Sequence, residues 1–164
     1  MKSSLHWKKK TFSSTYRIYS GDRQVGQLVE NSLKQSAVGE LNNSKYLFKT
    51  KGVFKQETEV IDIDSKTTIG KISYNAMMNK AEIQYPNRTV HWKYDNKWQT
   101  RWSLSDTRGI QMAFRGGLSK GSIECSDEDD LLVLTGLFVT NFYWQMTIVI
   151  MVAVFLPIWA TLVT

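Results

Sequence analysis

The residues best suited to chemistry in this chain are five carboxylates within seven positions. They are Glu124, Asp127, Glu128, Asp129 and Asp130. Carboxylate oxygens are the ligands that hard divalent cations prefer, but the spacing matches no established ion-binding loop. Ser126 followed by Asp129 instead matches the pattern that starts a helix, where carboxylates in the first turn complement the helix dipole. We therefore expect a helix cap here and no bound metal.

Groups for catalysis are sparse elsewhere. His6 and His91 are the only histidines and Cys125 is the only cysteine. The chain shows no Ser, His and Asp spacing and no Cys and His metal pattern. The glycine-rich stretch 115–121 lacks the Gly-Lys-Ser/Thr order of a phosphate-binding loop, so it predicts a hairpin loop. We expect neither enzymatic activity nor a cofactor.

Alternating aromatic and basic residues between Val90 and Leu104 form the sharpest local pattern. Period two is typical of strands with one apolar face and one solvated face. The pattern predicts core aromatics at Trp92, Tyr94, Trp98 and Trp102. It also predicts a basic outer surface, which is a candidate site for lipid or a partner. Together with two residues from later in the chain, this surface comprises His91, Lys93, Lys97, Arg101, Arg115 and Lys120.

The turn in this segment decides which aromatics share a face. A three-residue loop over 95–97 pairs Tyr94 with Trp98 and keeps all four aromatics together, whereas a two-residue turn at 95–96 separates them. We expect the longer loop. Basic residues between aromatics can also bind single-stranded nucleic acid. The strict alternation favours core packing, so we do not expect a nucleic-acid partner.

Similar short alternating runs cover most of the chain, separated by Gly, Asn, Asp and Ser clusters, as in all-β barrels and sandwiches. The predicted strands lie at 15–20, 23–30, 36–41, 45–50, 58–64, 67–74, 80–85, 89–94, 98–104, 109–115 and 119–125. An apolar-Gly-x-apolar sequence recurs at 25–28, 38–41 and 69–72. A glycine within a strand predicts a bulge or a close backbone approach.

The final 34 residues, 131–164, contain no charged side chain. As a helix they would measure roughly 50 Å, whereas a bilayer core needs only about 20 residues. A polar and aromatic island splits them, and we place the membrane boundary there, at Asn141, Tyr143, Trp144 and Gln145. Residues 146–164 then form the transmembrane segment. The alternative is one overlong, tilted anchor.

Charge divides the chain in the same way. All 21 Lys and Arg precede Glu124, against 10 of the 15 acidic residues, so the body is basic. A basic surface favours anionic lipid headgroups or nucleic acid. The basic N-terminus has no apolar run behind it, as a signal peptide would, so we expect the body to face the cytoplasm. The charges nearest the predicted span in sequence are acidic.

About a dozen strands closed by the segment 127–145, an acidic run followed by an apolar stretch, resemble the tubby C-terminal-like superfamily, which includes LURP-one-related proteins and phospholipid scramblases. The resemblance covers about residues 16–145. It implies a closed antiparallel barrel around a hydrophobic C-terminal helix, with contact to lipids. Tubby proteins bind phosphoinositides through basic surface residues, but no matching motif assigns such residues here. The cysteine-rich and calcium-binding features of scramblases are not evident.

The sequence therefore predicts a mainly β chain in three parts. Residues 1–14 form a basic N-terminal segment, 15–145 a closed antiparallel β-barrel with a central helix from about 127, and 146–164 a C-terminal transmembrane anchor. We expect a non-catalytic, scramblase-like module that binds lipid headgroups or a membrane-protein partner at the cytoplasmic surface. The alternative is an accessory subunit of a membrane protein complex that packs through its C-terminal helix.

Overall fold

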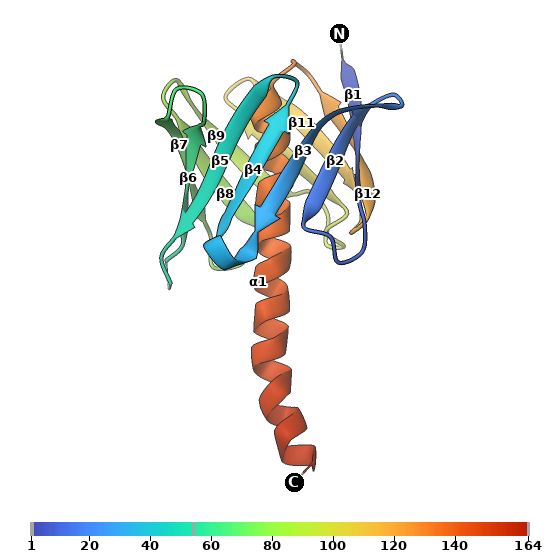
Figure 1. The fold of residues 1–164 in the computed structure, drawn as a ribbon, viewed down its shortest axis with the longest axis vertical. Helices are drawn as coiled ribbons and strands as arrows, with labels where there is room; N and C mark the ends of the chain where they lie inside the picture. Colours follow the sequence, from blue (N-terminus) through green and yellow to red (C-terminus); the bar gives the residue numbers. More distant parts are fainter. Residues whose placement is uncertain (1, 54, 164) are drawn as a thin grey trace.

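The computed structural model describes residues 2–53 and 55–163, and within them twelve antiparallel strands close around one helix. The strands are β1 (Ser3–Lys9), β2 (Thr15–Ser20), β3 (Arg23–Asn31), β4 (Ser36–Leu41), β5 (Ser44–Lys51), β6 (Glu57–Asp62), β7 (Thr67–Tyr74), β8 (Lys80–Tyr85), β9 (Arg88–Tyr94), β10 (Arg101–Asp106), β11 (Gly109–Gly116) and β12 (Lys120–Cys125). Each strand pairs with its neighbours in sequence, and β1 pairs with β12 to close the barrel. Helix α1 (Asp130–Val163) follows β12, runs through the barrel and leaves at the opposite end (Figure 1). The predicted fold class is confirmed.

The strands follow the alternation of the sequence. Every predicted strand is present, with boundaries within three residues. In β3 and β7 the register shifts beside Gly26 and Gly70, so that Val25 has no partner on β2 and Ile69 has none on β6. These two bulges confirm the prediction at 25–28 and 69–72, whereas Gly39 of the third repeat lies in an unbroken ladder against the Leu134 side chain of helix α1. Bulges bend and twist a strand, which helps a sheet to curve into a closed wall.

The N-terminus is not a separate basic segment, and that prediction was wrong. Residues 3–9 form strand β1, which pairs with both β2 and β12. Trp7 points into the barrel and is buried, while Lys8 on the next position is exposed. The strand was missed because its inner face carries only two large apolar residues, Leu5 and Trp7, with Ser3 and Lys9 at its ends, so the alternation is short.

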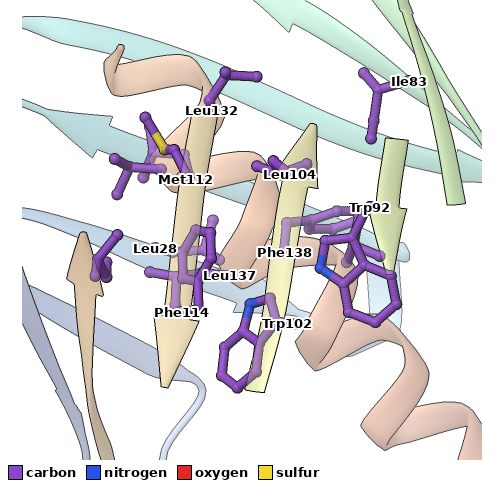
Figure 2. Packing of buried hydrophobic residues seen from close by; sticks show 14 of the residues in the cluster. Leu28, Ile83, Trp92, Trp102, Leu104, Met112, Phe114, Leu132, Leu137 and Phe138 are labelled. Carbon is purple, nitrogen blue, oxygen red and sulfur yellow. The ribbon is translucent and has the colours of Figure 1, made fainter. Parts of the chain in front are cut away.

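The core lies between the wall and the first half of helix α1 (Figure 2). Phe138 of the helix stacks on Phe48 of β5 with ring centroids 4.6 Å apart. Trp102 and Phe114, from β10 and β11, stack at 5.5 Å. Phe114 also lies against the helix at Gly136, where an added Cβ would come within 2.2 Å of its ring. Glycine at position 136 therefore lets the helix approach the wall.

Helix α1 changes surroundings along its length. Its first half is buried by the barrel at residues 132–139, 141 and 143, residues 144–147 are half-buried, and residues 148–163 are exposed. The helix is long and apolar enough to cross a membrane, and its most apolar 18-residue window has no buried residue. One overlong anchor is therefore excluded, because the barrel encloses the first half of the segment.

We predict that Gly136→Leu destabilises the barrel by about 1–3 kcal/mol, because the added side chain overpacks the Phe114 contact. Denaturant unfolding of the full chain in detergent, followed by near-ultraviolet circular dichroism, would measure this change. Ala153→Leu in the exposed half of the same helix is the matched control and should leave the midpoint unchanged. Equal midpoints for both variants would contradict the close packing at Gly136.

Candidate functional site

The two ends of the barrel carry different loops. Helix α1 begins at the end where β12 finishes and leaves at the other end, where the odd-numbered strands finish (Figure 1). We call the loops at the helix exit the exit rim; they are 10–14, 32–35, 52–56, 75–79, 95–100 and 117–119. The loops at the other end, the far end, are 21–22, 42–43, 63–66, 86–87, 107–108 and 126–129.

Every loop of the exit rim carries an exposed large apolar residue among its described positions. These residues are Phe12, Leu33, Val53, Met77, Trp98 and Leu118. Their exposure runs from 63% at Leu118 to 104% at Phe12. The far-end loops, whose residues are all described, have no exposed large apolar residue. Single exposed apolar residues are common on proteins, but a ring of six around one helix is a candidate interaction surface.

The charges of the two ends are also opposite. The exit rim carries Lys10, Lys34, Lys55 and Lys97 against Asp95, a net charge of +3. The far-end loops carry five acidic residues against Lys66 and Arg108, a net charge of −3. The acidic run before the helix therefore lies at the far end, although it is nearest to the tail in sequence. The charges that surround the exposed helix are mainly basic.

The exposed helix has no polar spacer between it and the rim. Gln145 is half-buried at the mouth, and Ile148, three residues later, is already exposed. Apolar side chains then cover all sides of the helix. Exposing such a surface to water costs roughly 25 cal/mol per Å². If an apolar environment surrounds the exposed helix, moving the barrel away from it would therefore expose apolar surface to water.

Asn141 fixes the depth and rotation of the helix at the barrel mouth. Its Oδ1 accepts hydrogen bonds from Lys9 Nζ at 3.1 Å and from Tyr16 Oη at 3.1 Å. Its Nδ2 donates to the carboxylate of Glu30. Hydrogen bonds to charged groups contribute roughly 1.5–3 kcal/mol each. The amide has partners on β1, β2 and β3, so a shift of the helix by one residue would break all three contacts.

Burial shapes the titration of this cluster. It raises the pKa of the Glu30 carboxyl, and hydrogen bonds from the Asn141 and Gln145 amides offset part of the increase. Burial also lowers the pKa of the Lys9 ammonium, although the charge of Glu30 opposes this. The pKa of Tyr16 is raised, chiefly by burial. The mouth therefore holds one carboxylate and one ammonium that are partly dehydrated and bridged by an amide.

Two of the four predicted membrane-boundary residues lie inside the barrel. Asn141 and Tyr143 are buried, and Tyr143 Oη donates to the backbone oxygen of Lys80. Protein groups therefore occupy the positions expected for lipid headgroups, so that prediction is corrected for these two residues. Trp144 and Gln145 are half-buried at the mouth itself. The sequence around Asn141 and Tyr143 could not predict their burial, because their hydrogen-bond partners come from distant strands.

The predicted basic surface divides into two groups. All six of its residues are exposed on the outside of the wall or in a loop. Lys97 lies in the exit rim, and Arg101, Arg115 and Lys120 lie at or near the exit ends of their strands, where Arg101 is directly opposite Arg115. Lys93 is also one position from the exit end of its strand, β9, and lies 3.9 Å from Asp95 of the exit rim, so of the six only His91, at the middle of β9, lies away from that end.

Trp98 is not a core residue, and that prediction was wrong. It is 86% exposed in loop 95–100, whereas Trp92 and Trp102 are buried and Tyr94 is partly buried against Trp92. The loop is longer than the expected three residues, and Tyr94 pairs with Trp102. Asn96 Oδ1 stabilises the longer loop by accepting from the backbone N–H groups of Thr100 and Arg101.

The acidic stretch caps the helix, but through a different residue from the one predicted. Asp129 Oδ1 accepts from Leu132 N at 3.0 Å, and Arg88 pairs with the Asp129 carboxylate. Ser126 instead donates to the Ile110 carbonyl. Asp130 accepts from Asn42 at 2.8 Å, which attaches the helix start to loop 42–43. Among the described residues, no group of three or more His, Cys, Asp or Glu could hold a metal ion.

Sequence reasoning missed the ring of apolar residues on the exit rim. Each lies in a polar or glycine-containing loop, where a single apolar residue forms no periodic pattern. The available signal was the strand count, because in an up-and-down barrel alternate loops lie at the same end. Once the N-terminal strand β1 is included in the count, grouping alternate loops places the six apolar residues at the same end of the barrel.

Comparison of the chain with protein-family models, curated proteins and solved structures found no match. The tubby-like assignment therefore stays a prediction. The closed barrel around a hydrophobic helix, which that resemblance implied, is present.

We predict that Glu30→Gln stabilises the barrel near neutral pH but not in acid. A raised pKa means that the folded state binds a proton more tightly, so the parent loses stability as pH rises from the ordinary carboxyl value of about 4.3 through the raised pKa. Glutamine lacks this loss and can still accept from Asn141. Denaturant unfolding of the full chain in detergent from acid to neutral pH would compare the two.

Glu82→Gln on the exposed outer face of β8 is the matched control. It removes the same charge away from the mouth and should follow the profile of the parent. Parallel profiles for Glu30→Gln and its parent over the whole range would contradict a dehydrated carboxyl at position 30.

Proposed function

We propose that this protein is a non-catalytic, membrane-anchored β-barrel module that rests its exit rim on the membrane surface and binds anionic lipid headgroups there. The exposed half of helix α1 serves as the anchor, and the barrel faces the cytoplasm. The single observation that carries the proposal is the ring of six exposed apolar residues surrounding the point where an apolar helix leaves the barrel.

Attachment at the rim follows from the helix. Its apolar exposed surface begins at the mouth, so a membrane that covers Ile148 also reaches the loops around it. Apolar residues on an interfacial surface typically enter the boundary between headgroups and acyl chains to about 5–10 Å. Trp98 is suited to that depth because indole combines an apolar ring with a polar N–H. The far end, with its acidic loops, would then point into water.

The charge distribution supports both the ligand and the orientation. Lysines near an anionic surface contribute about 1 kcal/mol each, and the exit rim holds four of them. Lys and Arg close to a span favour retention on the cytoplasmic side, whereas Asp and Glu have little effect. The acidic run, although nearest to the tail in sequence, lies at the far end of the barrel, and the charges nearest to the exposed helix are mainly basic. The structural basis for a cytoplasmic barrel is therefore stronger than the linear sequence suggested.

We predict that Lys34→Gln, Lys55→Gln and Lys97→Gln together weaken binding of the barrel to anionic vesicles by about 100-fold, since three lysines contribute about 3 kcal/mol. Vesicle flotation would measure this with a chain ending at Thr147, because the anchor of the full chain would hide the difference. Vesicles of phosphatidylcholine with and without phosphatidylglycerol separate headgroup charge from apolar contact.

Arg23→Gln, Lys45→Gln and Lys66→Gln, at the far end, are the matched control. They remove the same net charge and should reduce binding much less. Equal losses for the two sets would point to a general charge effect and contradict a rim contact. Binding that does not depend on phosphatidylglycerol would favour the alternative, an accessory subunit that packs through its helix.

A further inference from the structure

A cavity of about 230 Å³ lies between helix α1 and the barrel wall at the exit end. Among its described lining residues, half are Trp or Tyr and none carries a charge. The outer edge is formed by the rim residues Trp98 and Leu118, and the helix contributes Leu137, Thr140 and Trp144. Since Leu137 and Trp144 are seven residues apart, the cavity extends roughly 10 Å along the helix axis. We call it the aromatic cavity.

The lining determines which chemistry the cavity can accept. A phosphate or a carboxylate would find no cation among the described lining residues, because the rim lysines lie outside it. An apolar group would contact aromatic rings and Leu137 on several sides. For comparison, an apolar cavity of roughly 150 Å³ is large enough to bind benzene. The aromatic cavity therefore suits a segment of hydrocarbon.

We infer that the aromatic cavity accepts one hydrocarbon chain of a membrane phospholipid. The inference rests on the proposed function, because seating the exit rim on the membrane brings the cavity mouth to the level where acyl chains begin. A chain lying beside the exposed helix then needs only to turn into the barrel past Trp144, along the same helix. The lysines of the rim remain outside, at the level of the headgroup of the same lipid.

The test uses the full chain in bilayer nanodiscs of phosphatidylcholine and phosphatidylglycerol. The phosphatidylcholine carries a photoreactive diazirine at the end of one acyl chain, and adducts are mapped by proteolysis and mass spectrometry. We expect adducts on inner lining residues such as Tyr94 and Trp102, in addition to the exposed helix and the rim residues Trp98 and Leu118.

Two variants close the cavity in different ways. Thr140→Phe fills it from the helix, and Gly117→Trp narrows the mouth at a position where a Cβ meets nothing within 4 Å. Each should reduce adducts on Tyr94 and Trp102 several-fold while sparing those on the exposed helix. Thr147→Phe is the matched control, because Thr147 makes the same backbone hydrogen bond as Thr140 but does not line the cavity.

The outcomes separate this inference from the proposed function. Adducts on Trp98 and Leu118 without any on Tyr94 or Trp102 would overturn the lipid chain in the cavity and leave the seated rim intact. Adducts on the exposed helix alone would mean that the barrel stands away from the membrane and would overturn both. Inner adducts that persist in Thr140→Phe and Gly117→Trp would show that the label reaches the wall by another route and would also overturn the inference.

Discussion

Filling of the barrel by helix α1 is the constraint on which the other features depend. About eight strands already enclose a space that side chains can just fill, so a closed barrel of the twelve described strands needs a further element inside. An α-helix with its side chains is about 10–12 Å across, and this one fills the interior with apolar residues on every side. Gly136 permits a close approach to Phe114 of the wall, and Asn141 fixes the rotation and depth at the mouth. The same helix then determines where the exposed segment leaves and which loops surround it.

One uncharged segment therefore has two environments. Up to about Thr147 it is apolar because the wall surrounds it, and beyond that point we propose that it is apolar because lipid surrounds it. The transition is continuous, with no polar stalk between barrel and span. Because the helix is a single element, the orientation of the barrel follows from the direction in which the helix leaves. The exit rim, with its apolar tips and lysines, lies at that transition.

Much of the fold could be predicted from the sequence, because each strand reports its own alternation of inner and outer residues. Contacts that depend on pairing could not be predicted in this way. Trp98 occupies an even-numbered position, as the core aromatics do, but the loop is longer than expected and Trp98 is exposed outside the core. Asn141 appeared to be a headgroup residue because Lys9, Tyr16 and Glu30, its partners, lie more than 100 residues earlier. The exit rim emerges only when loops from along the whole chain are grouped by the end of the barrel they occupy.

Helix α1 is barrel core up to about Thr147, and we propose that it is a membrane anchor beyond that residue. Alkaline extraction of membranes that contain the full chain, or a chain that ends at Thr147, tests this division. We expect the full chain to resist extraction, whereas the shorter chain is released and unfolds cooperatively as a barrel. A shorter chain that still resists extraction, or that is soluble only when unfolded, would contradict the division of the helix.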